Sequence, residues 1–209
     1  DLGADMIMLM PPYHGVGLQA DEAAVIEHFD RAANAGGIPI MVQDAPLSGV
    51  QLPVRLLARM AQSIPLLQYF KIETPQAAGK LRALIAQGGD DIVGPFDGEE
   101  GITLMADLDA GATGTMCSAL IPDLIRPVLE AHQVGDREAA AQHYQRILPL
   151  INYENRQCGL RATKAVMKEG GVIHSDHVRH PLAPLDPTTR TGLLELARQF
   201  EPLALRWGL

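Results

Sequence analysis

The chain has 209 residues, with 17 basic and 25 acidic side chains and a formal net charge of −8. This balance, without any cluster of basic residues, argues against nucleic acid or an anionic membrane surface as the main partner. No apolar run is long enough to span a bilayer, and two cysteines do not make a disulfide framework. Composition therefore predicts a cytoplasmic protein that acts on small molecules.

Short apolar segments alternate with helical patterns along the first part of the chain. Each apolar segment is followed by turn residues, which is typical of buried parallel strands. The expected strands cover residues 5–10, 38–42, 67–72, 91–95 and 114–117. The expected helices between them cover residues 21–35, 52–62, 75–88 and 101–108. The strand starts recur at the spacing of β–α units, so we predict an α/β fold with a parallel sheet.

Local signals refine this first region. Thr74 followed by Pro75 is typical of an N-cap and a first helical residue. Asp97, with Glu100 three residues later, resembles a capping box, so Asp97 is expected to cap a helix rather than to contact a ligand. Three methionines alternate along the first strand and are expected to fill the core, at positions Met6, Met8 and Met10.

The pattern changes after Cys117, where no further strand is indicated. Helices are predicted over residues 122–134, 136–153, 160–168 and 188–200. We therefore divide the chain into an α/β region, residues 1–121, and a helical region, residues 122–209. A three-residue ladder of histidines precedes Pro181, but its flanking glycines and proline disfavour a helix, so no metal site is expected at His174, His177 and His180.

Two charged side chains share one face of the third predicted strand. Because strand side chains alternate, Lys71 and Glu73 point the same way from an apolar segment. A lysine amine in such surroundings could form a Schiff base with a ketone, and the carboxylate could move protons on the bound substrate. A buried ion pair that only stabilises the fold explains the same pattern, and the local residues leave both interpretations open. The three remaining lysines fall in helical patterns and are expected to be solvated, at Lys80, Lys164 and Lys168.

Three segments, taken in order, carry a family resemblance. They are Pro11-Pro12-Tyr13-His14, Gln43-Asp44-Ala45-Pro46-Leu47-Ser48-Gly49 and Lys71-Ile72-Glu73. The chain resembles the dihydrodipicolinate synthase and N-acetylneuraminate lyase superfamily of Schiff-base (β/α)8 TIM barrels. This resemblance implies that residues 1–121 supply barrel strands four to eight, with the N-terminal strands absent from this chain. Residues 122–209 would then supply the last barrel helix and a C-terminal helical extension, and Lys71 would form the imine with a 2-keto acid.

Departures from the family pattern point to one of its branches. Gln43 stands where the family has a proton-relaying tyrosine, and an amide does not act as a general acid or base. Ser48 stands where the lysine-pathway synthases carry a carboxylate-binding arginine, so both changes argue against dihydrodipicolinate synthase. Glu73 supplies a titratable group where most members have a small residue. The chain is most similar to the dehydratase branch, which implies that Lys71 and Glu73 catalyse water loss from a 2-keto-3-deoxy sugar acid, L-2-keto-3-deoxyarabonate, to give 2-oxoglutarate semialdehyde.

Two alternatives stay open at this point. One is a class I aldolase that cleaves a similar substrate to pyruvate and an aldehyde, and the other is a non-catalytic sugar-acid-binding protein or an inactive fragment. The imine serves as the electron sink, so no metal or organic cofactor is expected. The resemblance further implies a homo-oligomer, by analogy a tetramer. The expected substrate-binding residues, each of which also suits a packing or turn role, are Tyr13, His14, Gln43, Ser48, Gly94 and Ser118.

Overall fold

The computed structural model describes residues 3–13, 15, 17–45 and 49–208. Internal contacts divide the chain into two compact units, Asp1–Met116 and Cys117–Leu209, which are described one at a time. Within the described ranges, no helix is both long and apolar enough to cross a bilayer.

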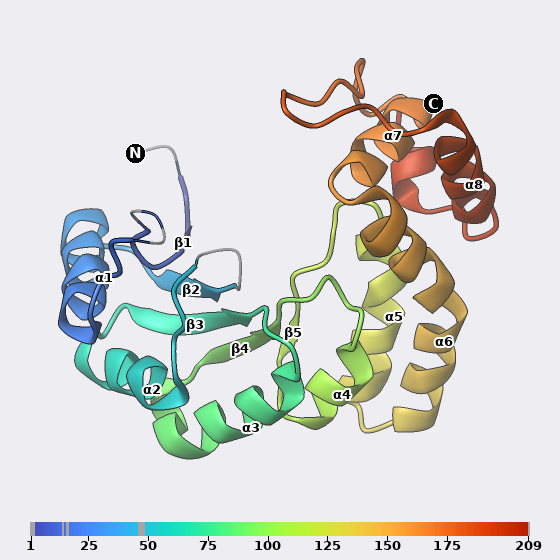
Figure 1. Cartoon of the computed structure of the whole chain (residues 1–209). Helices are drawn as coiled ribbons and strands as arrows, with labels where there is room; N and C mark the ends of the chain where they lie inside the picture. Colours follow the sequence, from blue (N-terminus) through green and yellow to red (C-terminus); the bar gives the residue numbers. More distant parts are fainter. Residues whose placement is uncertain (1–2, 14, 16, 46–48, 209) are drawn as a thin grey trace. The chain divides into compact units, whose positions relative to one another are not determined.

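The first unit contains a five-stranded parallel sheet in the order β1-β2-β3-β4-β5 (Figure 1). The strands are β1 Ile7–Leu9, β2 Ile40–Asp44, β3 Leu67–Ile72, β4 Gly94–Asp97 and β5 Gly114–Thr115. Each neighbouring pair is parallel, so the predicted α/β fold with a parallel sheet is confirmed. The fourth strand was predicted too early, because Gly89–Asp91 form a 3-10 turn before it.

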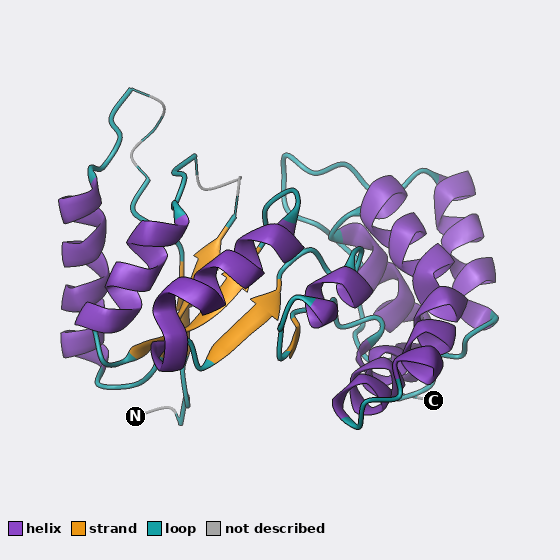
Figure 2. Cartoon of the chain, turned by 90° about the horizontal axis from the view of Figure 1, so that it is seen from below, coloured by secondary structure: helices purple, strands orange, loops and turns teal. Residues whose placement is uncertain are grey.

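Helices follow the first four strands of this unit: α1 Glu22–Gly36, α2 Val54–Ser63, α3 Ala77–Gly88 and α4 Leu104–Asp109. Figure 2 shows α1, α2 and α3 lying along one face of the sheet. Helix α1 begins where the carboxylate of Asp21 accepts a 2.8 Å hydrogen bond from the Ala24 N–H, and ends at Gly37 in the left-handed conformation. The buried core between strands and helices includes Phe29, Ile40, Leu57, Met60, Phe70, Ile72 and Leu84.

Both predicted helix caps beside the strand ends are wrong. Helix α3 begins two residues after Pro75, and its N-cap is Gln76 in the left-handed conformation, without a side-chain cap among the described residues. Helix α4 begins only after Thr103, so Asp97 is too far away to cap it. Asp97 instead ends β4 and is fully buried. In each case the loop between strand and helix takes residues that the sequence pattern assigned to the helix.

The expectation that the methionines of the first strand fill the core is wrong for two of the three, whereas Met10 is neither exposed nor fully buried. Met6 is 36% exposed and Met8 is 44% exposed. Strand β1 is the first strand of the sheet and pairs only with β2 among the described residues, so these side chains have few neighbours to cover them.

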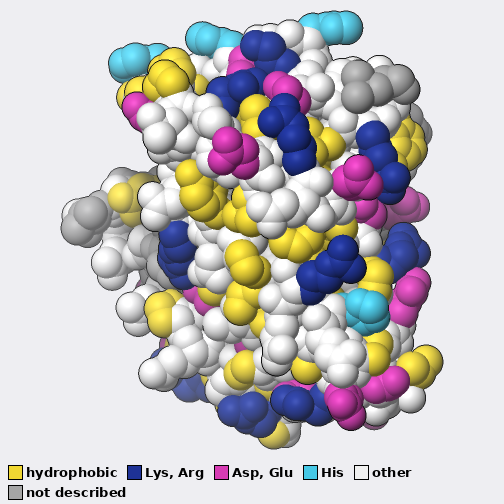
Figure 3. Space-filling view, turned by 90° about the vertical axis from the view of Figure 1, so that its right-hand side faces the viewer, with side chains coloured by type: hydrophobic (Ala, Val, Ile, Leu, Met, Phe, Trp, Pro, Cys, Tyr) yellow, Lys and Arg dark blue, Asp and Glu magenta, His cyan; other side chains and the backbone are white. Residues whose placement is uncertain are grey.

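The second unit is helical. Its helices are α5 Pro122–Gln133, α6 Arg137–Tyr153, α7 Arg161–Glu169 and α8 Pro187–Arg198, and all four agree with the predicted helices to within about two residues. A π-helical turn, Glu154–Cys158, extends α6, and a 3-10 turn, Leu203–Leu205, follows α8. On the face seen in Figure 3, side chains of both charges are interspersed among apolar and other side chains.

Candidate active site

Lys71 and Glu73 meet at the carboxyl end of β3, as the strand alternation predicts. The Lys71 Nζ lies 3.1 Å from Glu73 Oε2, and the two side chains are only 9% and 23% exposed. Strand β3 pairs with β2 on one side and with β4 on the other, so the backbone of Lys71 is fixed in the middle of the sheet. The amine and the carboxylate are therefore adjacent, largely shielded from water and carried by a rigid element.

Gln43 completes this group from the neighbouring strand. The β2–β3 register pairs Gln43 with Lys71, which places the amide beside both charged groups. Gln43 Nε2 donates a 2.9 Å hydrogen bond to Glu73 Oε2, the same oxygen that faces the lysine. The amide thus orients the carboxylate without any capacity to transfer a proton itself.

Gly98 lets the chain pass close behind the lysine as it leaves β4. A Cβ added at this residue would lie 2.9 Å from Lys71 Cγ and 2.7 Å from the backbone carbonyl of Ile72. The Gly98 N–H donates to that carbonyl at 2.9 Å. Sequence reasoning missed this residue, whose only signal was an Asp-Gly pair at the end of a strand.

A second ion pair, which the sequence did not predict, joins the last residue of β2 to the first turn of α3. Lys80 was expected to be solvated, but its side chain is only 19% exposed and its Nζ lies 2.5 Å from Asp44 Oδ2. Burial raises the pKa of Asp44, the ion pair with Lys80 opposes that rise, and the charge of Glu73 adds to it. A cavity of about 560 Å³ adjoins the pair, and its lining includes Thr74 and Leu52.

Two buried carboxyl groups hold the loop that follows β4. Asp97 accepts hydrogen bonds from the backbone N–H groups of Glu99 and Gly101, and its Oδ2 lies 2.5 Å from the Thr115 hydroxyl on β5. Asp107 is equally buried, and burial raises its pKa to about 6, with further upward contributions from the charge of Asp97 and a hydrogen bond to it. Asp97 therefore has a structural role, although not the helix-capping role that was predicted.

The predicted substrate-binding residues are spread more widely. Tyr13 is exposed, and its ring lies against Gly49 after β2. Gly94 begins β4, where an added Cβ would collide with the ring of Tyr69, so packing accounts for this glycine. His14 and Ser48 lie outside the described residues.

Ser118 belongs to the helical unit, where it serves a buried carboxyl group. Its hydroxyl oxygen accepts a 3.2 Å hydrogen bond from the Leu120 N–H, and a hydrogen bond from Ser118 lowers the pKa of Glu154, against the larger effect of burial, which raises it. The Thr163 hydroxyl donates to the same carboxylate at 3.2 Å. A substrate contact by Ser118 stays a prediction.

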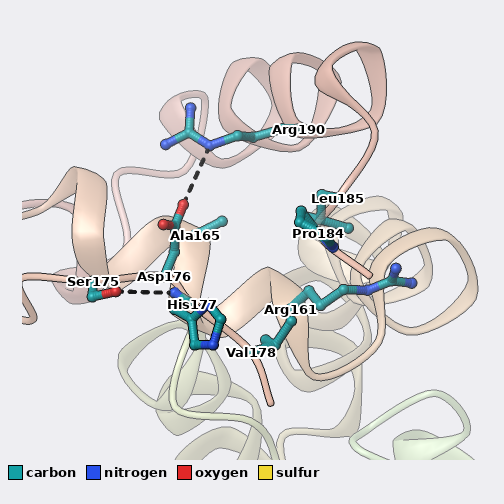
Figure 4. A pocket seen from close by; sticks show the side chains of 9 residues that line it. All are labelled: Arg161, Ala165, Ser175, Asp176, His177, Val178, Pro184, Leu185 and Arg190. Carbon is teal, nitrogen blue, oxygen red and sulfur yellow. Dashed lines mark hydrogen bonds and ion pairs between the residues drawn. The ribbon is translucent and has the colours of Figure 1, made fainter. Parts of the chain in front are cut away.

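The helical unit contains a cavity of about 250 Å³ next to the histidine-containing connection (Figure 4). Arg190 and Asp176 both line it and form an ion pair, with 3.8 Å between Nε and Oδ2. Arg161 donates to the carbonyls of Cys158 and Ala183. The charged groups of this cavity are thus engaged within the protein. No group of three His, Cys, Asp or Glu side chains in the described ranges is arranged to hold a metal ion.

A family model for the dihydrodipicolinate synthetase family matches residues 1–200. The chain belongs to this family. The resemblance inferred from the three motifs is therefore confirmed. The cluster of Lys71, Glu73 and Gln43 at the end of β3 lies within the matched residues and is the candidate active site on its geometry.

Among curated relatives, the L-2-keto-3-deoxyarabonate dehydratase of Azospirillum brasilense is 57% identical over 207 residues, covering 99% of this chain and 67% of that protein. The 4-hydroxy-tetrahydrodipicolinate synthase of Methanosarcina acetivorans is 28% identical over 198 residues, covering 93% of this chain and 65% of that protein. The chain thus spans about two thirds of the length of these family members.

Solved structures of the family show the same fold. Dihydrodipicolinate synthase from Rhodopseudomonas palustris matches with a TM-score of 0.81 at 26% identity, covering 94% of this chain and 66% of that one. Dihydrodipicolinate synthase from Aquifex aeolicus matches with a TM-score of 0.85 at 20% identity, covering 95% and 67%. The predicted fold class, a TIM barrel to which this chain contributes the described strands, is confirmed.

Proposed function

We propose that this protein is a Schiff-base dehydratase of a 2-keto-3-deoxy sugar acid, with L-2-keto-3-deoxyarabonate as its substrate. The observation that carries the proposal is the contact of Lys71 with Glu73 at 3.1 Å, with Gln43 oriented onto the same carboxylate oxygen. The 57% identity to a relative named for this reaction supports the choice of substrate. No cofactor is part of the proposal, because the imine itself accepts the electron pair.

The first half of the reaction uses both charged residues. The neutral amine of Lys71 adds to the C2 ketone, and one water leaves as the protonated imine forms. The cationic imine withdraws electrons from C3, so a C3 proton becomes acidic. Glu73 accepts this proton, and the electron pair of the broken C3–H bond moves into the C2–C3 bond to give an enamine. The position of Glu73, two residues beyond Lys71 on the same face of the strand, suits this transfer.

In the second half, the enamine expels the C4 hydroxyl. The nitrogen lone pair re-forms the C2–N double bond, the second electron pair of the C2–C3 double bond moves to form a C3–C4 double bond, and the C4–O bond breaks. The hydroxyl leaves as water with the proton that Glu73 returns. Loss of a C5 proton gives a dienamine with an enol at C5, and addition of a proton at C3 restores the protonated imine. Addition of a second proton at C4, with loss of the proton of the C5 hydroxyl, then converts the enol into an aldehyde. Addition of water to the imine then releases 2-oxoglutarate semialdehyde and the free Lys71 amine, so the net change is the loss of one water.

Gln43 favours this reaction over aldol cleavage. Cleavage to pyruvate and an aldehyde requires removal of the proton on the C4 hydroxyl, a role suited to a phenolic relay. Here the group next to Glu73 is an amide, which donates a hydrogen bond and does not exchange its protons during catalysis. The carboxylate is thus the proton-transferring group of the described cluster, and it lies beside the nitrogen that will carry C2.

Borohydride trapping tests the proposal directly. The full-length protein is incubated with 2-keto-3-deoxy-L-arabonate and borohydride and is then digested. The mass of the peptide that contains Lys71 is measured by mass spectrometry. We expect a reduced five-carbon adduct on Lys71 that has lost water. A three-carbon pyruvate adduct would show the aldolase reaction instead. An unmodified Lys71 in folded protein would leave a structural ion pair and would overturn the proposal.

The proposal also covers the substrate contacts, the cellular location and the assembly of the protein. The substrate contacts predicted from the resemblance, at Tyr13, Ser48 and the other positions named above, belong to it. So do a cytoplasmic location and assembly into a homo-oligomer, by analogy a tetramer. Light scattering during size-exclusion chromatography of the full-length protein measures its molar mass in solution. The mass of a monomer would contradict the proposed assembly.

A further inference from the structure

Asp44 ends β2 one residue after Gln43, and its side chain points to the opposite face of the sheet. Alternation along the strand turns Gln43 toward Lys71 and Glu73, and turns Asp44 toward the helices. There the nearly fully buried carboxylate meets Lys80 of α3, with 2.5 Å between Nζ and Oδ2. A charge at this depth costs free energy unless it is paired, so the two groups depend on one another.

The backbone of Asp44 is in addition hydrogen-bonded to the backbone of Glu73. The carbonyl oxygen of Asp44 accepts a 2.9 Å hydrogen bond from the backbone N–H of Glu73. One residue is thus bound through its backbone to Glu73 and through its side chain to Lys80. A displacement of Asp44 would move the acceptor to which Glu73 is attached.

The turn that leads from Glu73 into α3 has few stabilising interactions within itself. Gln76 has a φ of 61°, a left-handed conformation that is unfavourable for a residue with a side chain. The Thr74 hydroxyl is buried without a hydrogen-bond partner in the described part of the chain. Helix α3 also starts without a side-chain cap among these residues. The Lys80 ion pair therefore supplies an anchor that the turn itself does not provide.

We infer that the Asp44–Lys80 ion pair positions Glu73 for proton transfer, acting through the Asp44 backbone and the turn before α3. This inference rests on the proposed dehydratase function. Lys71 depends less on this anchor, because β2 and β4 pair with it from both sides. Loss of the ion pair should therefore slow the proton transfers by Glu73 and spare imine formation by Lys71.

The experiment compares two rates in the full-length protein and its variants. Lys80→Met and Asp44→Asn each remove the pair, and Lys80→Arg keeps a cation able to reach Asp44. Arg55→Met is the matched control, because it removes an ion pair with Glu22 that joins α2 to α1 in the same unit. Borohydride trapping on Lys71 measures imine formation, and product formation from 2-keto-3-deoxy-L-arabonate measures dehydration. Circular dichroism and thermal unfolding establish that each variant is folded.

In Lys80→Met and Asp44→Asn, we expect kcat to fall at least about tenfold while the trapping rate stays within about twofold. The trapped adduct should shift toward the intact five-carbon substrate that has not lost water. Lys80→Arg should recover most of kcat, and Arg55→Met should match the wild type.

Unchanged dehydration in both pair-breaking variants would overturn the inference. So would an equal fall of trapping and dehydration, because that is the result of general destabilisation. If wild-type Lys71 is not trapped at all, the proposed function fails first and the inference falls with it, a result visible before any variant is made.

Discussion

Lys71 Nζ and Glu73 Oε2 lie 3.1 Å apart on one face of β3, with the Gln43 amide bonded to the same oxygen. Once the imine has formed and taken a proton, the nitrogen keeps its positive charge beside the carboxylate. The base therefore stays attracted to the group that acidifies C3 throughout the proton transfer. The ion pair that stabilises the ligand-free site is in this way also the arrangement that the proposed reaction needs.

Glu73→Gln should separate imine formation from water loss. The amide keeps the size of the side chain and a hydrogen bond with Gln43, but it does not accept a proton from C3. We expect dehydration to fall by about a hundredfold to ten-thousandfold, the usual contribution of a general acid or base. Borohydride should still trap a five-carbon adduct on Lys71, now with the mass of the substrate before water loss.

Glu138→Gln is the control for that substitution, since Glu138 is an exposed residue of α6 bonded to Gln142. Its dehydration rate should match the wild type. Full activity in Glu73→Gln would show that another group removes the C3 proton.

Gln43→Leu should misorient the carboxylate. The substitution removes the 2.9 Å hydrogen bond to Glu73 Oε2 and leaves Lys71 as the partner of that oxygen. A partly buried carboxylate that loses one charge-assisted hydrogen bond is less well fixed, so we expect dehydration to slow by about tenfold. Steady-state kinetics measure the change. Gln142→Leu, which removes a surface amide–carboxylate contact, should have no effect. Equal rates for Gln43→Leu and the wild type would exclude an orienting role.

Gly98→Ala should disturb both the fold and the lysine. The added methyl group would lie 2.7 Å from the Ile72 carbonyl and 2.9 Å from Lys71 Cγ, and the first of these neighbours is backbone that cannot turn away. We expect a loss of about 1–3 kcal/mol in the free energy of unfolding, as for other overpacked sites, together with slower trapping on Lys71. Urea unfolding and the borohydride assay measure the two effects.

The matched variant is Gly79→Ala in α3, where an added Cβ meets nothing within 4 Å. This variant should be neutral or stabilised by up to about 1 kcal/mol, because alanine is the better helix former. A Gly98→Ala protein as stable and as reactive as the wild type would contradict the close approach.

The sequence was most informative where one physical rule decides the outcome. Alternation along an extended strand was enough to place Lys71 and Glu73 together, and the β3 bounds agree with the prediction. Periodicity likewise gave the helices of the second unit, since an amphipathic helix must bury one stripe of side chains whatever its neighbours are.

Contacts between elements distant in sequence were harder to predict. Nothing near Lys80 indicates that α3 brings it to Asp44, 36 residues earlier, so a solvated side chain was the natural expectation. Asp97 has the spacing of a capping residue, but its carboxylate instead accepts hydrogen bonds from the Thr115 hydroxyl and from a backbone N–H of the turn after β4. The hydrogen bond from Gln43 to Glu73 required the β2–β3 register, which no single segment encodes.

Asp107 should make the folded protein less stable as the pH rises from about 4 to about 6. Burial raises its pKa from 3.8 to about 6. Between these two values the folded state holds a proton that the unfolded state has released. The free energy of unfolding therefore falls with increasing pH, by up to about 1.4 kcal/mol per pH unit for this one group, and its contribution levels off above the folded-state pKa. Urea unfolding of the wild type and of Asp107→Asn across this range measures the difference.

Asp107→Asn resembles the protonated acid, because it is neutral, has nearly the same size and places no negative charge beside Asp97. The variant should therefore gain stability relative to the wild type as the pH rises from 4 toward 7. Asp176→Asn provides the opposite control: a hydrogen bond from Lys168 lowers the pKa of Asp176, so that interaction stabilises the fold above the ordinary carboxyl pKa and is lost as the pH falls below it. If the stability difference between the wild type and Asp107→Asn is the same at pH 4 and at pH 7, then Asp107 does not hold its proton in the folded state, and the buried pair with Asp97 must be satisfied in another way.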